Sequence, residues 1–396
     1  MPQEHLQTEE RQAGLSQEQQ SAATAPPPVQ VPISPPPSVS QSGTGHQVDN
    51  NDVRITPAAL RAMQEAVRRA LERQEIAAAF ECFEAEANRA KKLHNSLGLT
   101  ALVLLIATLL LATFRLMAPR LGLTLPQELE TFGLIAGPIP LLIFLWLRLG
   151  RVHERWLLSR YKAERIRHWK FHQLLRGSYI EGRQSSAPGN VIVQTDTFEQ
   201  RWADLMEDIS QGTGSMENFL RNEDFCLAFP VQVYNDQTVA GSALDAYRRY
   251  RLNVQINWFT QEEVKYTAAD RKTGGAAYSL LLGGAILTFL DPILHLLLHG
   301  SGRSVTNVWL LGIGVALTLL SAGVRVYRSA SGISENAERY QNVRVQLVQL
   351  RRDLERLEQQ NGTQEDRLKV LTEVERVLHT ELVEFLRVAK KSDYLL

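Results

Sequence analysis

Four long apolar stretches without a single charged residue constrain this chain more than any other feature. They cover residues 97–114, 132–147, 274–290 and 305–324. A helix needs about 20 mainly apolar residues to cross the hydrocarbon core of a bilayer. The second stretch is short and contains Pro138 and Pro140, which predicts a kink or a locally thinned bilayer. We therefore predict an all-α membrane protein with four transmembrane helices.

Basic residues lie on one side of these stretches. They include Arg89, Lys91, Lys92, Arg148, Arg151, Arg155, Lys265, Arg271, Lys272, Arg325 and Arg328. In the two short loops, 119–131 and 298–304, the only Lys or Arg residues are Arg120 and Arg303. Because cytosolic segments carry the excess of Lys and Arg, both loops are predicted to lie outside and both termini in the cytosol.

Helical patterns flank the apolar stretches. Thr56-Pro57 is a good helix start, and no Gly or Pro interrupts the chain from there to Asn95. A second helix is predicted at 156–175, after the second stretch, and a third from Ser242 into the third stretch. The predicted organisation is therefore two helix–span–span–helix units, residues 53–182 and 242–396.

The remaining segments have a different composition. Residues 1–52 are rich in Pro and Gln, which predicts a disordered tail, with a PxxP-type docking peptide as an alternative. Residues 183–241 are predicted to be a cytosolic connector or insert, with a possible strand at Val191–Val193 and a helix near Phe198–Ile209.

The C-terminal region, 335–390, is predicted to form a helical hairpin. Its first half has an a/d seam formed by Tyr340, Val343, Leu347, Leu350, Leu354 and Leu357. Asn361-Gly362 interrupts this seam, and Thr363 with Asp366 resembles a capping box. The seam covers fewer than three heptads, which favours packing within the chain over an extended coiled coil.

Composition and motifs argue against several classes of function. Lys+Arg and Asp+Glu are equal at 43 each, so no basic excess indicates nucleic-acid binding. The phosphate-loop, GxSxG and HExxH motifs do not occur, so we expect no enzyme, no catalytic residues and no cofactor. Cys82 and Cys226 are far apart in the sequence and predict neither a disulfide nor a zinc site.

Two pairs of histidines have the i,i+4 spacing that can hold a metal on one helix face: His168 with His172, and His295 with His299. Neither pair has a third ligand nearby in the sequence, so no metal site is predicted. The outer pair, His295 and His299, could instead respond to pH.

Small residues recur every four positions in the apolar stretches, where they permit close helix packing in lipid. They are Gly133 and Gly137, then Gly275, Ser279 and Gly283, and finally Gly312 and Ala316. Packing within one chain and packing between protomers both explain them. Asp291, beside Pro292, either lines a pore or lies at a helix end at the outer interface.

Short motifs resemble those of the SLATT family, the SMODS and SLOG-associating 2TM effector domains of bacteria. The C-terminal unit carries Tyr250-Arg251-Leu252, Gln255 and Trp258-Phe259 before its first span, and Asn336-Ala337-Glu338-Arg339-Tyr340 after its second. Val374-Glu375, Leu378 and Glu381 resemble the acidic tail motif of the family. In the N-terminal unit, Arg160, Ala163-Glu164 and Arg167 resemble its R-x-x-A-E-x-x-R motif. Phe385-Leu386 departs from the family pattern, which often has Trp at that place.

The resemblance implies a tandem of two subtypes in the inner membrane of a bacterial cell. It further implies a homo-oligomeric, pore-forming or membrane-perturbing effector, linked to a nucleotide-producing or nucleotide-sensing partner in a defence system. Arg160, Glu164, Arg167, Tyr250, Arg251, Gln255 and Trp258 are the candidate signal-coupling residues, with packing on the C-terminal hairpin as the simpler explanation. The alternative function is a non-conducting membrane scaffold that recruits partners through its cytosolic helices. A transporter is disfavoured, because the two units are not inverted relative to each other.

Overall fold

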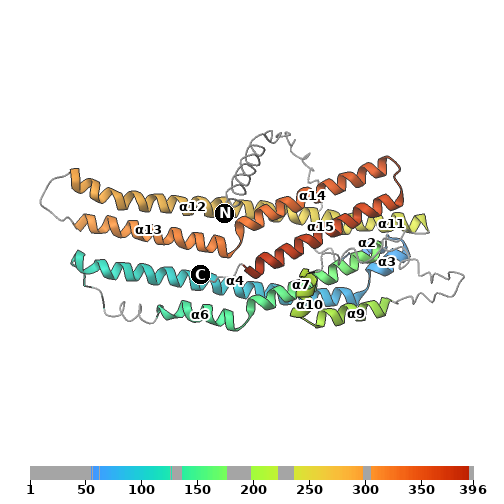
Figure 1. The fold of residues 1–396 in the computed structure, drawn as a ribbon, viewed down its shortest axis with the longest axis horizontal. Helices are drawn as coiled ribbons and strands as arrows, with labels where there is room; N and C mark the ends of the chain where they lie inside the picture. Colours follow the sequence, from blue (N-terminus) through green and yellow to red (C-terminus); the bar gives the residue numbers. More distant parts are fainter. Residues whose placement is uncertain are drawn as a thin grey trace, which may run out of the picture. The chain divides into compact units, whose positions relative to one another are not determined.

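The computed structural model describes residues 55, 57–61, 63–124, 126, 136–175, 198–221, 236–297 and 305–391. The chain divides into two compact units, Met1–Val48 and Asp49–Leu396. The first unit, with most of the predicted tail, lies outside the described residues, as does the possible strand at 191–193. The described part of the second unit is helical and contains no strand (Figure 1).

The N-terminal part of this unit begins with α2 (Pro57–Arg61), α3 (Glu65–Leu71) and α4 (Gln74–Met117). The uninterrupted helix predicted from Pro57 is therefore wrong, because the chain leaves the helical path twice before α4. Leu60, Val67 and Leu71 are all buried in the main apolar core, and α3 packs against α11. Burial of these three side chains outweighs the local helix propensity.

After α4 come the 3-10 helix η2 (Ala118–Leu121), α6 (Pro138–Leu149), α7 (Val152–His172) and the 3-10 helix η3 (Gln173–Leu175). Pro138 and Pro140 lie in the first turn of α6, where a missing N–H is tolerated. The helices α9 (Phe198–Ser210) and α10 (Thr213–Arg221) follow. The first of these confirms the helix expected near 198–209, and α10 packs against α7.

The C-terminal part consists of α11 (Gln237–Tyr247), the π-helical turn η4 (Arg248–Leu252), α12 (Asn253–Leu297), α13 (Val305–Ala330), α14 (Ile333–Gln359) and α15 (Gln364–Lys391). The first helix begins before Ser242 because Asp236 caps it, its carboxylate accepting from the backbone N–H of Thr238 at 2.8 Å. The backbone of α12 continues helically through Asp291 and Pro292 to Leu297, so the alternative that places a helix end at Asp291 is wrong.

The predicted C-terminal hairpin is observed as α14 and α15, which pack against each other. Asn361 adopts a left-handed conformation (φ 52°) at the turn. The hydroxyl of Thr363 accepts a hydrogen bond from the Asp366 backbone N–H at 3.1 Å and donates one to its carboxylate at 2.6 Å. Thr363 therefore caps the start of α15, and the Asp366 carboxylate bonds the Thr363 hydroxyl where a full capping box would bond its backbone N–H.

Three helical stretches in the described part are long and apolar enough to cross a membrane, judged by length and composition. They are Glu65–Met117, Gln237–Leu290 and Trp309–Gln359. The predicted second span lies partly outside the described residues, and the 12 residues of α6 are shorter than a full crossing requires. Large apolar side chains are exposed on α4, α6 and α12, including Leu99, Val103, Leu116, Leu141, Leu142, Ile286 and Phe289. A surface of this kind is typical of contact with lipid.

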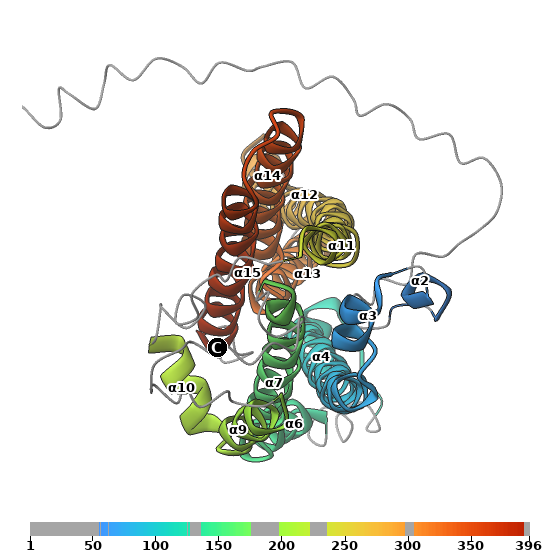
Figure 2. The ribbon, with the colours of Figure 1, turned by 90° about the vertical axis from the view of Figure 1, so that its right-hand side faces the viewer.

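The elements group into two bundles that lie side by side. Figure 2 shows α4, α6 and α7 in one group, and α11 to α15 in the other. Contacts between α4 and α13 join the apolar ends, and contacts between α7 and α15 join the opposite ends. The two predicted helix–span–span–helix regions thus pack together within the single compact unit Asp49–Leu396.

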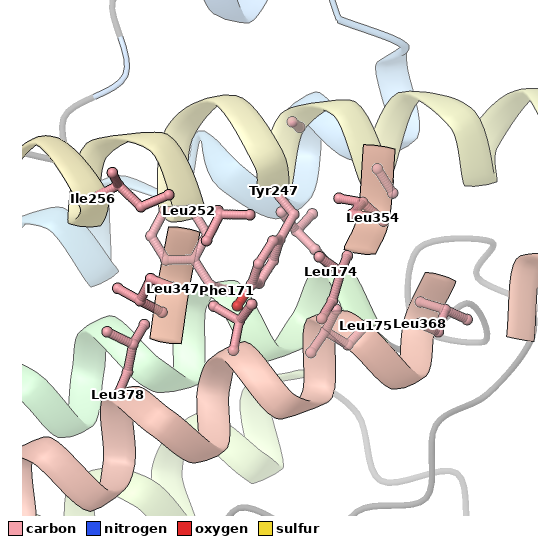
Figure 3. Packing of buried hydrophobic residues seen from close by; sticks show 14 of the residues in the cluster. Phe171, Leu174, Leu175, Tyr247, Leu252, Ile256, Leu347, Leu354, Leu368 and Leu378 are labelled. Atoms are coloured by element: carbon pink, nitrogen blue, oxygen red, sulfur yellow. The ribbon is translucent and has the colours of Figure 1, made fainter. Parts of the chain in front are cut away.

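The main core lies at the end of this compact unit that is away from the apolar stretches of α4, α12 and α13. Figure 3 shows side chains from α7, α11, η4, α12, α14 and α15 meeting there, among them Phe171, Tyr247, Leu347 and Leu378. Tyr340, Val343, Leu347 and Leu354 of the predicted seam are buried in this cluster. The seam therefore packs within the chain, as its short length predicted.

Candidate functional site

A buried carboxylate, Glu375 on α15, ties together three segments that are distant in the sequence. Its side chain is 0% exposed. It accepts hydrogen bonds from the Tyr247 hydroxyl at 2.6 Å, from Arg251 Nε at 3.0 Å and from His168 Nδ1 at 2.5 Å. A buried charge is tolerated only when it is paired and hydrogen-bonded. We call Glu375, Tyr247, Arg251 and His168 the Glu375 clamp.

Each donor of the clamp comes from a different local structure. His168 projects from α7, Tyr247 is the last residue of α11, and Arg251 lies in the π-helical turn η4. Arg251 is 1% exposed, and its guanidinium also faces the Phe171 ring at 5.3 Å. Single π-helical turns inside α-helices occur frequently at functional sites. Here the turn carries Arg251, whose guanidinium reaches Glu375.

The electrostatics of the clamp favour the ionised carboxylate. Burial alone would raise the pKa of Glu375, but the charges of Arg251 and His168 outweigh it and hold this pKa well below its ordinary value. Burial and the neighbouring Glu375 charge raise the pKa of Tyr247 well above its ordinary value, so this phenol remains a donor.

A second charged group lies beside the clamp, on the facing sides of α7 and α4. The Glu164 carboxylate lies 2.5 Å from Arg160 and 2.7 Å from Arg167. Glu84 of α4 lies 4.0 Å and 3.8 Å from the same two arginines. Burial would raise the pKa of Glu164, but Arg160 and Arg167 lower it to about 2. These contacts join α4 to α7 through charge.

The hairpin contributes a third set of polar groups. Arg339 of α14 lies 3.4 Å from Glu381 of α15. Burial raises the pKa of Glu381, against the opposing effect of Arg339. His379, one turn after Glu375, has its pKa lowered to about 4 by burial and by the proximity of His168.

A cavity of about 460 Å³ is lined by α4, α7, η4, α12, α14 and α15, and by some members of these groups: Glu84, Arg160, Glu164, Arg167, His168, Arg251 and Glu381. Six of the seven predicted signal-coupling residues line it: Arg160, Glu164, Arg167, Arg251, Gln255 and Trp258. Tyr250 does not, and instead packs at the edge of the main core. The motifs quoted from the two units and from the tail therefore converge on one place.

Several residues of this site were not predicted as members of it. Tyr247 precedes Arg251 by four positions, so helical spacing could have placed both on one face. The spacing of His168 suggests only half of a metal pair, whereas its side chain bonds Glu375. Lys91 and Glu84 gave no signal, because only the packing of α4 on α7 brings them here.

The predicted small residues serve different contacts. A Cβ built on Gly312 would meet the Met117 side chain of α4, and one on Gly283 would lie 3.6 Å from Leu317. At Gly275 a Cβ would meet nothing within 4 Å in the described part of the chain, and Ser279 one turn later is exposed. Gly137 precedes α6, Ala316 is half-buried on α13, and Gly133 lies outside the described residues.

The backbones of α12 and α13 also come close together at two other glycines. A Cβ on Gly284 would lie 2.8 Å from the carbonyl oxygen of Gly314, and one on Gly314 would lie 3.0 Å from that of Gly284. Nearby, the buried Ser321 hydroxyl donates to the Ala277 carbonyl oxygen at 2.6 Å. Close backbone packing with an interhelical hydrogen bond is the usual way for helices to associate in lipid.

The remaining candidates are less informative. Asp291 lies within α12 but its side chain is outside the described part, as are His295 and His299. Cys82 is exposed, and Cys226 lies outside the described residues. Within the residues that the structure describes, no group of three or more His, Cys, Asp and Glu side chains could hold a metal ion.

No family model matches the chain, and neither a curated protein nor a solved structure shows significant similarity to it.

Proposed function

We propose that this protein is a membrane effector that assembles and permeabilises the inner membrane of a bacterial cell in response to a cytosolic signal. The proposal includes four spans, with α6 and the residues before it as the second, and both termini in the cytosol. It also includes a nucleotide-producing or nucleotide-sensing partner, as the resemblance to the SLATT family implies. The observation that carries the proposal is the continuity of two helices between the charged site and the apolar region.

The first of these helices is α4, a single helix of 44 residues. Its first half carries Glu84 and Lys91 at the cavity, and its second half contains the apolar stretch 97–114. The other is α12, 45 residues long, which follows directly on the turn that carries Arg251 and includes the stretch 274–290. A shift of packed helices at the charged site would therefore be transmitted along both helices into the bilayer.

Assembly is assigned to an exposed face of α12. Gly275 and Ser279 lie on this face together with Tyr278 and Leu282, whose side chains are exposed. In contrast to Gly284 and Gly314, no described residue would contact a Cβ at Gly275. Small residues that one chain leaves uncovered in lipid allow a second chain to approach closely.

The test is to express the protein in a bacterial host, alone and with the genes that neighbour it, and to record membrane potential and dye entry. We expect rapid depolarisation on triggering. Gly275→Leu should abolish it and reduce cross-linked oligomers, because the added side chain occupies the face assigned to the neighbour. Val345→Leu, at an exposed position of the cytosolic helix α14, is the matched control and should leave both signals unchanged.

An intact potential under every trigger, with abundant and correctly inserted protein, would contradict the proposal. The non-conducting scaffold would then be the better explanation. Full activity of Gly275→Leu would contradict the assignment of the assembly face.

A further inference from the structure

The cavity beside the Glu375 clamp has the size and position of a small-molecule site. Its volume of about 460 Å³ falls in the range of roughly 300–1,000 Å³ that is typical of ligand pockets. It lies between the two helix bundles, with walls from α4 and α7 in one bundle and from α12, α14 and α15 in the other. Such junctions are common places for ligand sites.

Four carboxylates line this cavity, and each of them lies near a cation of the protein itself. Glu164 and Glu84 share Arg160 and Arg167, as described above. Glu262 lies 3.2 Å from Lys265, and Glu381 lies 3.4 Å from Arg339. The negative charges of the lining are therefore already balanced.

Lys91 is different. Among the described residues, no carboxylate lies within ion-pair distance of its ammonium group, which sits 5.8 Å from the centre of the Trp156 ring. Its side chain is reached by solvent, because it faces the cavity. Burial, together with the charges of Arg160 and Lys265, lowers the pKa of Lys91 against the opposing effect of Glu262. An ammonium group that lies near other cations and forms no ion pair among the described residues is a natural partner for an external anion.

Aromatic side chains form the other part of the lining: Trp156, Trp258, Phe259, Tyr340 and Phe385. Trp156 and Phe385 meet edge to face at 5.9 Å, and Trp258 and Tyr340 at 5.4 Å. Both tryptophans are only half-buried, so part of each ring remains available to a ligand. Offset or edge-to-face contacts with such rings favour a planar aromatic group.

We propose that the cavity binds a small molecule that combines an anionic group, phosphate or carboxylate, with a planar aromatic ring. Lys91 contacts the anion, and Trp156 and Trp258 contact the ring. Binding itself does not require that the protein conducts. The further statement that this ligand is the cytosolic signal rests on the proposed function.

The experiment is calorimetric titration of the full chain in nanodiscs of zwitterionic lipid. Adenosine 5′-diphosphate serves as the phosphate-bearing probe and indole-3-acetate as the carboxylate-bearing probe. Adenosine and pyrophosphate each represent one half of the first probe. We expect at least one complete probe to bind saturably and more tightly than either half. The probe that binds identifies the anion.

The matched variants are Lys91→Gln and Lys92→Gln. Lys92 is the next residue on α4, is exposed, and does not line the cavity. Loss of a charged hydrogen-bond partner should weaken binding about ten-fold or more in Lys91→Gln. Lys92→Gln should bind as the parent does. Lys91→Gln breaks no ion pair among the described residues, so both variants should unfold at the temperature of the parent.

Two results would overturn the inference. One is the absence of saturable binding of either complete probe up to about millimolar concentration by folded protein. The other is equal binding by the parent and Lys91→Gln. Binding without depolarisation of cells would reject the proposed function and retain the ligand site, whereas depolarisation without binding would do the reverse.

Discussion

The apolar and the charged regions of this molecule hold their helices together by opposite means. Where α12 crosses α13, Gly284 and Gly314 bring the two backbones into contact, and the buried Ser321 hydroxyl bonds a carbonyl of the other helix. At the other end, Glu375 is held by Arg251, His168 and Tyr247 among aliphatic side chains. The first contact depends on the absence of side chains, and the second on long polar ones.

This difference follows from the surroundings of each region. In lipid the hydrophobic effect does not drive helices together, so close packing has to supply the association. In water the aliphatic core supplies it, and buried polar groups can then select one arrangement, because any other would leave a charge unpaired. The charged region should therefore respond strongly to changes in charge, and the apolar region to changes in volume.

The largest effect is expected from Glu375→Gln. The free energy of unfolding should fall by about 3–5 kcal/mol, because the buried guanidinium of Arg251 loses its counter-charge. Circular dichroism during urea unfolding in detergent would measure it. Glu373→Gln is the control, since Glu373 pairs with Arg376 at the surface, where a pair contributes about 1 kcal/mol or less. Equal effects of the two variants would show that charge does not specify this region.

A smaller effect is expected from acidification. The folded-state pKa of His379, about 4, lies below the ordinary value of 6.5, so the unfolded chain binds more protons between these two pH values. Stability should therefore be complete above pH 6.5 and fall as the pH drops towards 4, by roughly 3 kcal/mol in all. His379→Gln should remove this slope. The loss from protonating Glu375 belongs below the ordinary carboxyl pKa of 4.5 and should persist in the variant.

The slope is measured as the unfolding midpoint at a series of pH values for the parent and His379→Gln. Only the dependence on pH is compared, so a difference between the two proteins at pH 7 does not matter. Parallel curves from pH 6.5 to pH 4 would refute the role assigned to His379.

The smallest effect is expected from Gly314→Ala in the apolar region. Its Cβ would lie 2.5 Å from the Thr288 hydroxyl oxygen and 3.0 Å from the Gly284 carbonyl oxygen, so α12 and α13 must separate. Overpacking of this kind costs about 1–3 kcal/mol. Gly241→Ala in α11 is the control, because its Cβ has open space among the described residues and alanine favours the helix. Thermal unfolding in detergent should rank Gly314→Ala below both the parent and the control.

Local patterns in the sequence were sufficient for much of the architecture. The helix cap at Thr363 and the break at Asn361 are confirmed, because both depend on residues a few positions apart. The seam from Tyr340 to Leu354 was recognisable because buried positions on a helix repeat every three or four residues. The four-span arrangement stays a prediction, with three helical stretches of sufficient length in the described part.

The sequence by itself determined the helical class, the apolar helices and the C-terminal hairpin, since these follow from periodicity and composition over short distances. Only the tertiary structure decided that α2 and α3 leave the line of α4, because burial of Leu60, Val67 and Leu71 involves α11, far along the chain. The same holds for the Glu375 clamp, whose members are separated by up to 207 positions. Pairing of a buried charge is a property of the packed state, and no local pattern specifies which distant arginine or histidine will satisfy it.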